Sequence, residues 1–233
     1  MMTNGYGTTP SQLGVRPSAE LAQRLVTHAF GWMFAGLLLT AGVAVVVQTS
    51  PALTTLARNY FLFLVIGQLA LVFIISGAIH RLSAMVALGL FFVYAATLGL
   101  TVGLIVQAYT GASVGTAFLS ASAMFGAAAV YGATTKRSLA GLGGILFMGL
   151  IGVIVASVLN IFLHSTQVSW IISIVGVVLF TALTAYDVQR IQSGDVAAAS
   201  GSLEKGAVLG ALRLYLDFIN LFLFMLRLMG GRR

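Results

Sequence analysis

The sequence predicts an all-α membrane protein, a bundle of seven transmembrane helices with the last helix at its centre. Two features of the composition point to this class: 59% of the residues are hydrophobic and only 7% are charged, whereas soluble domains carry about 25% charged residues. The third feature is a series of apolar runs long enough to cross a bilayer, which needs roughly 20 residues per helix. We therefore expect one membrane domain over residues 25–230, a disordered polar tail over 1–24 and a basic C-terminal tail over 231–233.

The apolar runs follow one another with short joints rich in Gly, Ser and Pro, which are typical of helix connections. They cover about 26–47, 60–79, 83–106, 114–133, 139–163, 168–189 and 206–229, and the longest expected loop is about 190–205. The last run is weaker because Arg213 interrupts its start. It is either a full crossing or a re-entrant element shielded by other helices. We favour a full crossing, because late charges influence topology less than early ones.

The basic residues predict the orientation. With a cytosolic N-terminus, that side collects seven of them, and the opposite loops before the last span contain only Arg58. This excess is the positive-inside pattern of integral membrane proteins in a lipid bilayer. The same pattern explains the net charge of +7, so a nucleic-acid partner is not predicted. The seven residues are Arg16, Arg24, Arg81, Lys136, Arg137, Arg190 and Lys205.

Small and polar residues of the last run recur at steps of three and four, which places them on one helix face. Such a stripe lets the helix present a polar face to protein or water while its other faces stay apolar, and this predicts the central position. The stripe consists of Gly206, Gly210, Arg213, Asp217, Asn220, Phe224 and Arg227.

Two acidic residues, Asp187 and Asp217, lie inside apolar runs. An ionised carboxylate at the bilayer centre costs at least ~2.5–3.5 kcal/mol, so a buried acid usually has a function. If Arg190 and Arg213 mark the membrane edge, each aspartate lies about 5–6 Å inside it. Two acids at equal depth on consecutive helices can meet, share one proton, and then sense pH, bind a divalent cation or activate water. Alternatively, each aspartate pairs locally with its neighbouring arginine and only anchors its helix.

The segments around both aspartates carry a family resemblance. Thr184–Ile191 reads Thr-Ala-Tyr-Asp-Val-Gln-Arg-Ile, and Ala211–Gly230 contains Leu-Tyr-Leu-Asp-Phe-Ile-Asn-Leu-Phe. Both resemble the C-terminal signatures of the transmembrane Bax inhibitor motif family, and the seven-run layout resembles it over about residues 22–230. The resemblance implies a seven-helix bundle with a central last helix, located in the bacterial inner (plasma) membrane. It also implies a pH-sensitive calcium leak.

The family's aspartate pair corresponds to Asp187 and Asp217, and its gating arginine corresponds to Arg81. In this chain Arg81 follows His80, where relatives have a more basic cluster, and as an alternative it is only a positive-inside anchor. Calcium prefers six to eight oxygen ligands. The two aspartates with Asn220, Tyr186, Thr184 or water would form a weak site, which suits conduction. Calcium is then the transported species, and no cofactor is expected.

Two other functional classes compete with a calcium leak. An intramembrane aspartyl protease would also use two membrane aspartates, but it surrounds the second with Gly-x-Gly-Asp, where this chain has Leu214-Tyr215-Leu216-Asp217. We therefore do not expect an enzyme. The other alternative is a regulator that binds a membrane protease or a stress-response partner, as the resemblance also implies. The Gly-x-Ser-x-Gly pattern around Ser113 is not expected to be a nucleophile elbow, because that turn joins a strand to a helix.

Overall fold

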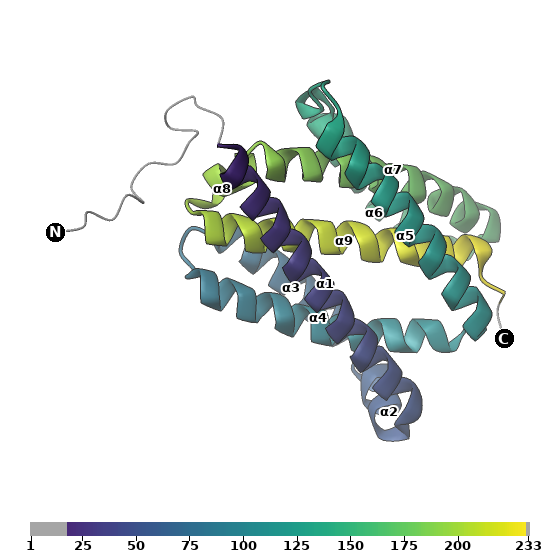
Figure 1. Cartoon of the computed structure of the whole chain (residues 1–233). Helices are drawn as coiled ribbons and strands as arrows, with labels where there is room; N and C mark the ends of the chain where they lie inside the picture. The colour runs from purple at the N-terminus through teal and green to yellow at the C-terminus, as the bar shows by residue number, and fades with distance from the viewer. Residues whose placement is uncertain (1–17, 232–233) are drawn as a thin grey trace. The chain divides into compact units, whose positions relative to one another are not determined.

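The computed structural model describes residues 18–231, which form helices and no strand (Figure 1). Seven of these helices are long and apolar enough to cross a membrane, as the sequence predicts. The helices are α1 (Ala19–Thr49), α2 (Pro51–Asn59), α3 (Phe61–Ala78), α4 (Ala84–Gln107), α5 (Gly111–Thr134), α6 (Gly143–Leu163), α7 (Thr166–Gln192), α8 (Asp195–Ser200) and α9 (Leu203–Met229), with a short 3-10 turn at Ala140–Leu142.

Helix α1 begins before the boundary expected at residue 24. The hydroxyl of Ser18 accepts a hydrogen bond from the backbone N–H of Leu21 at 3.3 Å, which caps the first turn. The expected tail therefore extends at most to Ser18, because residues 19–24 are helical. Residues 1–17 of that tail, and residues 232–233 of the expected C-terminal tail, lie outside the described part of the chain.

Two short helices occupy segments that were expected to be connections. α2 begins at Pro51, directly after Ser50, whose hydroxyl accepts from the backbone N–H of Leu53 at 3.4 Å. α8 lies between Gly194 and Gly201, both of which adopt positive φ angles of 81° and 85°. Such φ values favour glycine and delimit the helix at both ends. The loop expected over 190–205 is therefore wrong: α7 continues into it, α8 fills its middle and α9 begins within it.

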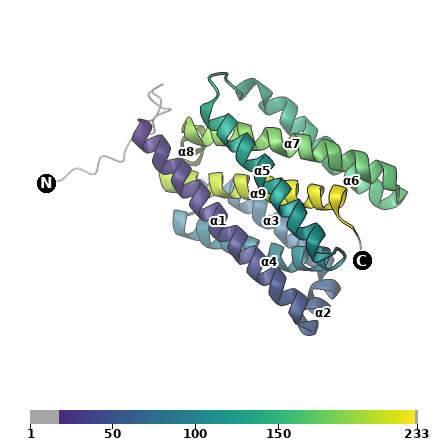
Figure 2. The same cartoon turned by 45° about the vertical axis from the view of Figure 1, so that its right-hand side comes forward.

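Helix α9 is a single unbroken helix of 27 residues, which corresponds to a length of about 40 Å. Both views of the chain show it, in green to yellow, as one continuous helix that does not reverse direction (Figures 1 and 2). A re-entrant element returns to the side from which it enters, so its chain must reverse direction. α9 therefore has the form of a full crossing. It is also the most buried of the seven spans. Of its most apolar window 67% is buried, against 50% for α4 and 44% for α7, in agreement with the central position predicted.

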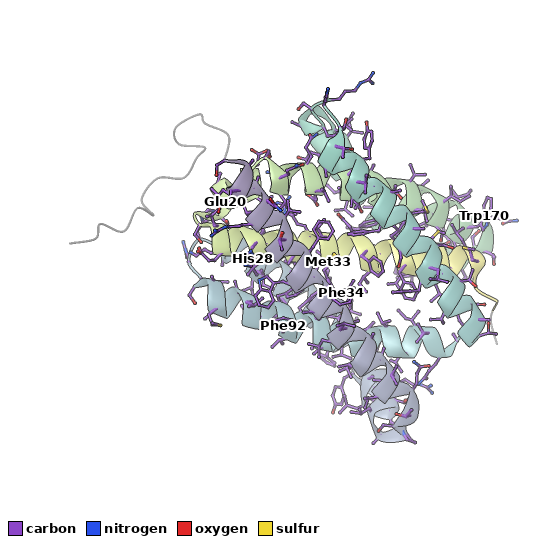
Figure 3. All side chains as sticks on the ribbon, in the orientation of Figure 1. Glu20, His28, Met33, Phe34, Phe92 and Trp170 are labelled. Carbon is purple, nitrogen blue, oxygen red and sulfur yellow. The ribbon has the colours of Figure 1, made fainter. Side chains whose placement is uncertain are left out.

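Large apolar side chains are exposed along the spans, as a lipid-facing surface requires. Phe34 of α1 is 60% exposed and Trp170 of α7 is 57% exposed, whereas Met33 beside Phe34 is buried (Figure 3). Lipid chains are as apolar as a leucine side chain, so such residues cost nothing in a membrane.

The chain divides into two compact units. Unit 1 takes the chain up to Ile105 together with Arg190–Tyr215, and unit 2 takes Val106–Gln189 together with the chain from Leu216. Helices α7 and α9 contribute to both units, so each unit contains part of the candidate site's helices.

Tyr215 of α9 is fully buried in unit 1, where its hydroxyl forms a hydrogen bond with the hydroxyl of Thr40 on α1. The Thr40 hydroxyl also lies 2.8 Å from the carbonyl oxygen of Ala95 and 3.0 Å from that of Gly36. Because carbonyl oxygens only accept, Thr40 donates to them and Tyr215 donates to Thr40. The ring of Phe91 packs edge-on against Tyr215 at 5.4 Å. These contacts fix the position of α9 within unit 1.

Candidate functional site

The two aspartates that the sequence singles out are both buried in the structure. The side chain of Asp187 on α7 is 6% exposed and that of Asp217 on α9 is 4% exposed. Both belong to unit 2. Carboxyl groups are rarely buried to this extent without a partner or a function.

Within unit 2, α7 and α9 pack directly on one another. The rings of Phe180 on α7 and Phe224 on α9 lie 5.9 Å apart. Gly176, one turn before Phe180, faces the same ring, and a Cβ atom at this position would lie 2.6 Å from Phe224. The lack of a side chain at Gly176 thus allows the two helices to approach closely.

Helix α7 also packs closely on α5 near Asp187. Gly132 of α5 lies against the backbone of Ala185, and any Cβ atom at Gly132 would overlap the carbonyl group of that residue. Ala185 forms a small apolar cluster with Ala128 and Leu139, covered by Tyr186. This contact holds the segment of α7 that precedes Asp187 in a fixed position.

The predicted supporting residues Thr184, Tyr186 and Asn220 all lie in unit 2. The Thr184 hydroxyl is buried and donates to the carbonyl oxygen of Phe180 at 2.8 Å. The Asn220 amide donates to the carbonyl oxygen of Leu216 at 2.8 Å. Both side chains thus bond within their own helices through a donor, and their oxygen atoms keep acceptor capacity for a cation. Tyr186 places its hydroxyl beside Gly143 at the start of α6.

Gln189 is a residue that the sequence analysis did not single out. Its side-chain oxygen accepts a hydrogen bond from the backbone N–H of Leu139 at 2.7 Å, and its amide nitrogen donates to the carbonyl oxygen of Arg137 at 3.0 Å. One side chain thereby fastens the connection between α5 and α6 to α7, close in sequence to Asp187. A glutamine near a helix end gives no signal of such a role, because its partners are backbone atoms distant in sequence.

We expect Gln189→Ala to release this connection. Loss of a hydrogen bond worth about 0.5–1.5 kcal/mol should raise the hydrogen-exchange rate of the Leu139 amide up to about tenfold. Peptide-resolved exchange of the detergent-purified protein measures this directly. Gln192→Ala, at an exposed position at the end of the same helix, is the matched control and should leave the rate unchanged. Unchanged exchange at Leu139 in Gln189→Ala would contradict the role.

The three arginines of the predicted site belong to unit 1. Arg81 is exposed in the turn between α3 and α4, and Lys205 donates from Nζ to the carbonyl oxygen of His80 in the same turn at 3.0 Å. Arg190 and Arg213 are half-buried. α9 begins at Leu203, so Arg213 lies about 15 Å along the helix. That Arg213 marks the membrane edge stays a prediction.

The surroundings of Asp217 are bulky and helical. Leu214, Tyr215 and Phe218 are all buried, and α9 continues without a break through this region. Large side chains thus stand at the positions where the aspartyl-protease pattern Gly-x-Gly-Asp has glycine.

Ser113 has a structural place at the start of α5. Its side-chain oxygen accepts from the backbone N–H of Gly231 at 3.0 Å, and its own backbone N–H donates to the Thr110 hydroxyl at 3.2 Å. Thr110 is thus the N-cap of α5 and Ser113 lies in its first turn, so the segment is not a strand-to-helix elbow, as expected. Within residues 18–231, no group of three or more His, Cys, Asp or Glu side chains gathers in a way that could hold a metal ion.

The fold and the buried carboxyl groups define an integral membrane protein with seven helical spans and acidic residues in its last two spans. The profile of the family described as Inhibitor of apoptosis-promoting Bax1 matches residues 22–233. The chain belongs to this Bax inhibitor family, as the resemblance of its two C-terminal segments indicates.

Bacterial relatives match more than nine tenths of the chain. It is 45% identical over 225 residues to the inner membrane protein YbhL of Escherichia coli (strain K12), a match that covers 94% of this chain and 96% of that protein. An uncharacterized protein of Deinococcus radiodurans is 41% identical over 214 residues, covering 91% and 93%. An uncharacterized protein of Borreliella burgdorferi is 40% identical over 218 residues, covering 91% and 94%.

Proposed function

We propose that the protein is a pH-sensitive calcium leak, in which protonation of Asp187 and Asp217 closes a passive path for cations. The observation that carries the proposal is the burial of both carboxyl groups, 6% and 4% exposed, on two helices that pack together in one unit. Burial of two acids in membrane spans is costly, and an ion or proton pathway is the usual reason for it.

The packing of α7 on α9 supports a meeting of the two carboxyl groups. Consecutive spans joined by a short connection run in opposite directions. Asp187 follows Phe180 by seven residues, and Asp217 precedes Phe224 by seven residues. Seven residues are close to two helical turns, or about 10.5 Å. A contact two turns from Phe180–Phe224 along both helices would therefore pair Asp187 with Asp217, which supports the proposal.

The chemistry of this pair suits weak and reversible binding of calcium. Two carboxylates supply charge, and the oxygens of Thr184 and Asn220 or water supply further ligands. A site with few protein ligands exchanges its ion quickly, as conduction requires. A proton taken up by the pair at low pH removes charge from the site, so we expect flux at neutral pH and closure at acid pH.

The remaining parts of the proposal concern orientation and gating. A cytosolic N-terminus follows from the excess of basic residues on that side. Arg81, in the turn between α3 and α4, is then at the cytosolic end of the bundle, where its cation can pair with a carboxylate in one gating state. Its exposed side chain equally suits an anchoring role, and loss of pH gating in Arg81→Gln would separate the two.

Flux through the reconstituted protein tests the function. The full chain in liposomes should pass calcium faster at pH 7–8 than at pH 5–6, and faster than protein-free liposomes at either pH. Parallel measurements with sodium, potassium and protons establish selectivity. Calcium flux equal to that of protein-free liposomes at every pH would exclude a leak. That result is expected of a protein that only binds a membrane protease or another regulatory partner.

A further inference from the structure

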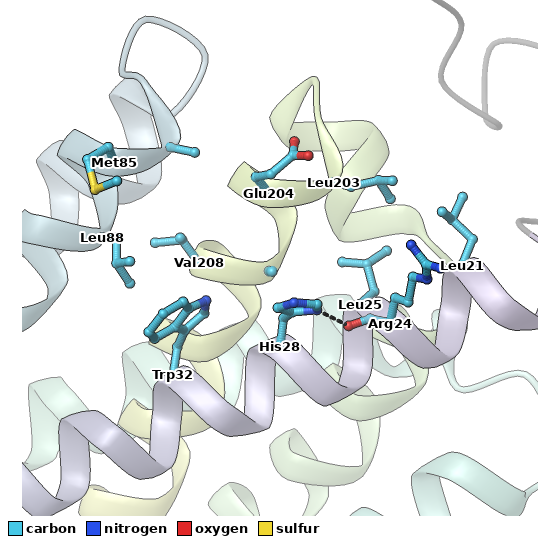
Figure 4. Close-up of a pocket in the computed structure, with 12 residues that line it drawn as sticks. Leu21, Arg24, Leu25, His28, Trp32, Met85, Leu88, Leu203, Glu204 and Val208 are labelled. Carbon is cyan, nitrogen blue, oxygen red and sulfur yellow. Dashed lines mark hydrogen bonds between the residues drawn. The ribbon is translucent and has the colours of Figure 1, made fainter. Parts of the chain in front are cut away.

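A pocket of about 370 Å³ lies in unit 1 between the ends of α1, α4 and α9 (Figure 4). Its volume falls within the range of about 300–1,000 Å³ that is typical of small-ligand sites. Its lining includes Leu21 near the start of α1, Ala84 at the start of α4 and Leu203 at the start of α9. The pocket therefore begins at the ends of three membrane spans and is not part of the proposed ion path in unit 2.

The charged and polar residues of the lining lie among apolar ones on α1 and α9. On α1, Arg24, His28 and Trp32 follow one another at steps of four residues, so they share one face. On α9, Glu204 precedes Val208 by the same step. Arg24 therefore lies nearer the start of α1 than Trp32 does, and Glu204 lies nearer the start of α9 than Val208 does, with Leu21 and Leu203 beside them (Figure 4).

The polar groups at the mouth carry charges of both signs. Arg24 of α1 is a cation whose Nη2 donates to Glu20 at 2.8 Å, which leaves its other N–H groups as donors. Glu204 is an exposed carboxylate in the first turn of α9, and it lines the pocket. His28 lies 2.7 Å from the carbonyl oxygen of Arg24 through Nδ1. A carbonyl only accepts, so Nδ1 carries the proton and Nε2 of the neutral ring is an acceptor.

The apolar part of the pocket includes an exposed side chain of α4. Met85 of α4 is 77% exposed, and Leu88 lies one turn deeper on the same helix. Trp32 is half-buried and packs edge-on against Phe92 with ring centroids 6.1 Å apart. An indole at this depth, with an apolar body and one N–H donor, is typical of the lipid interface.

We propose that this pocket binds a zwitterionic phospholipid with an ethanolamine headgroup. Its ammonium group would donate to the Glu204 carboxylate and to Nε2 of His28, and its phosphate would accept from Arg24. Its glycerol and first acyl carbons would lie along Trp32 and Leu88. A purely anionic lipid matches this mouth less well, because Glu204 repels it and offers no donor.

Tryptophan fluorescence tests the proposal, since the chain has two tryptophans, Trp32 and Trp170. The variant Trp170→Phe leaves Trp32 as the one tryptophan and as the reporter of the pocket. The protein is reconstituted in mixtures of two phospholipids, one of which carries brominated chains that quench a tryptophan in contact. Brominated phosphatidylethanolamine should quench Trp32 about two- to fivefold more effectively than brominated phosphatidylglycerol at equal mole fraction, as expected for partly exposed charge pairs.

Variants separate a headgroup site from general lipid contact. In the Trp170→Phe background, Glu204→Gln should abolish the preference for the ethanolamine lipid. Asp195→Asn, which removes an exposed carboxylate on α8 outside the pocket, should keep it. Brominated phosphatidylcholine, whose ammonium group has no N–H, should quench less than the ethanolamine lipid. Equal quenching by the ethanolamine and glycerol lipids, or a preference that survives Glu204→Gln, would overturn the proposal.

Discussion

Asp217→Asn should abolish the pH dependence of calcium flux and lower the flux at neutral pH by about tenfold, equivalent to ~1.4 kcal/mol of ion binding. Asparagine has the shape of aspartic acid but no charge at any pH, so it reproduces the protonated state permanently. The side chain is 4% exposed, so surrounding water compensates little for the lost charge. Fluorescent-indicator measurements of calcium entry into liposomes at several pH values give both quantities.

Substitution of the second aspartate, Asp187, tests whether the two carboxyl groups act as a pair. If Asp187 and Asp217 act as one pair, Asp187→Asn should give the same loss, and the double variant should be little worse than either single variant. Asp195→Asn, exposed on α8, serves as the control and should leave flux and its pH profile unchanged. Flux in Asp217→Asn with the pH profile of the parent protein would refute the proposed gating, and additive losses would refute the pairing.

Gly132→Ala should destabilise the protein by overpacking the contact between α5 and α7. The new Cβ atom would overlap the carbonyl group of Ala185 on α7, and this is a backbone atom that no rotamer change can move. Overpacking of this kind costs about 1–3 kcal/mol, which should lower the unfolding temperature by about 2–10 °C. Thermal unfolding in detergent, followed by intrinsic fluorescence, measures the change.

A second glycine of the same helix provides the control. Gly126 of α5 has open space where a Cβ atom would stand. Alanine is about 0.5–1 kcal/mol more favourable than glycine within a helix, so Gly126→Ala should leave the unfolding temperature unchanged or raise it. If Gly132→Ala lowers the unfolding temperature no more than Gly126→Ala does, α5 and α7 are less closely packed than the structure indicates.

The spans and the two acids could be predicted from the sequence because each depends on local composition. Apolar runs of sufficient length must form helices in a membrane, since every backbone polar group has to be satisfied within the segment. The burial of Asp187 and Asp217 follows from the runs that contain them. The polar stripe of the last run correctly indicates that α9 is the most buried span.

Other features depend on atoms that sequence patterns do not bring together. α2 and α8 are short helices delimited by a serine cap and by two glycines with positive φ, which also fit an ordinary loop. The start of α9 at Leu203 was not inferred because two charged residues and a glycine, Glu204, Lys205 and Gly206, follow it and interrupt the apolar run. The role of Gln189 requires backbone partners about fifty residues away in the chain, and the pocket of unit 1 combines three separate helix ends.

The contact of Phe180 with Phe224 defines the register of α7 relative to α9. The chain contains no cysteine, so a pair of introduced thiols would be its only sulfhydryl groups, and a disulfide within one chain could form only between them. Cysteines introduced at positions 187 and 217 would lie two turns from the aromatic contact. A disulfide or a short bismaleimide could join them only if the two helices keep this register. Oxidative cross-linking in native membranes would thus read the register without purification.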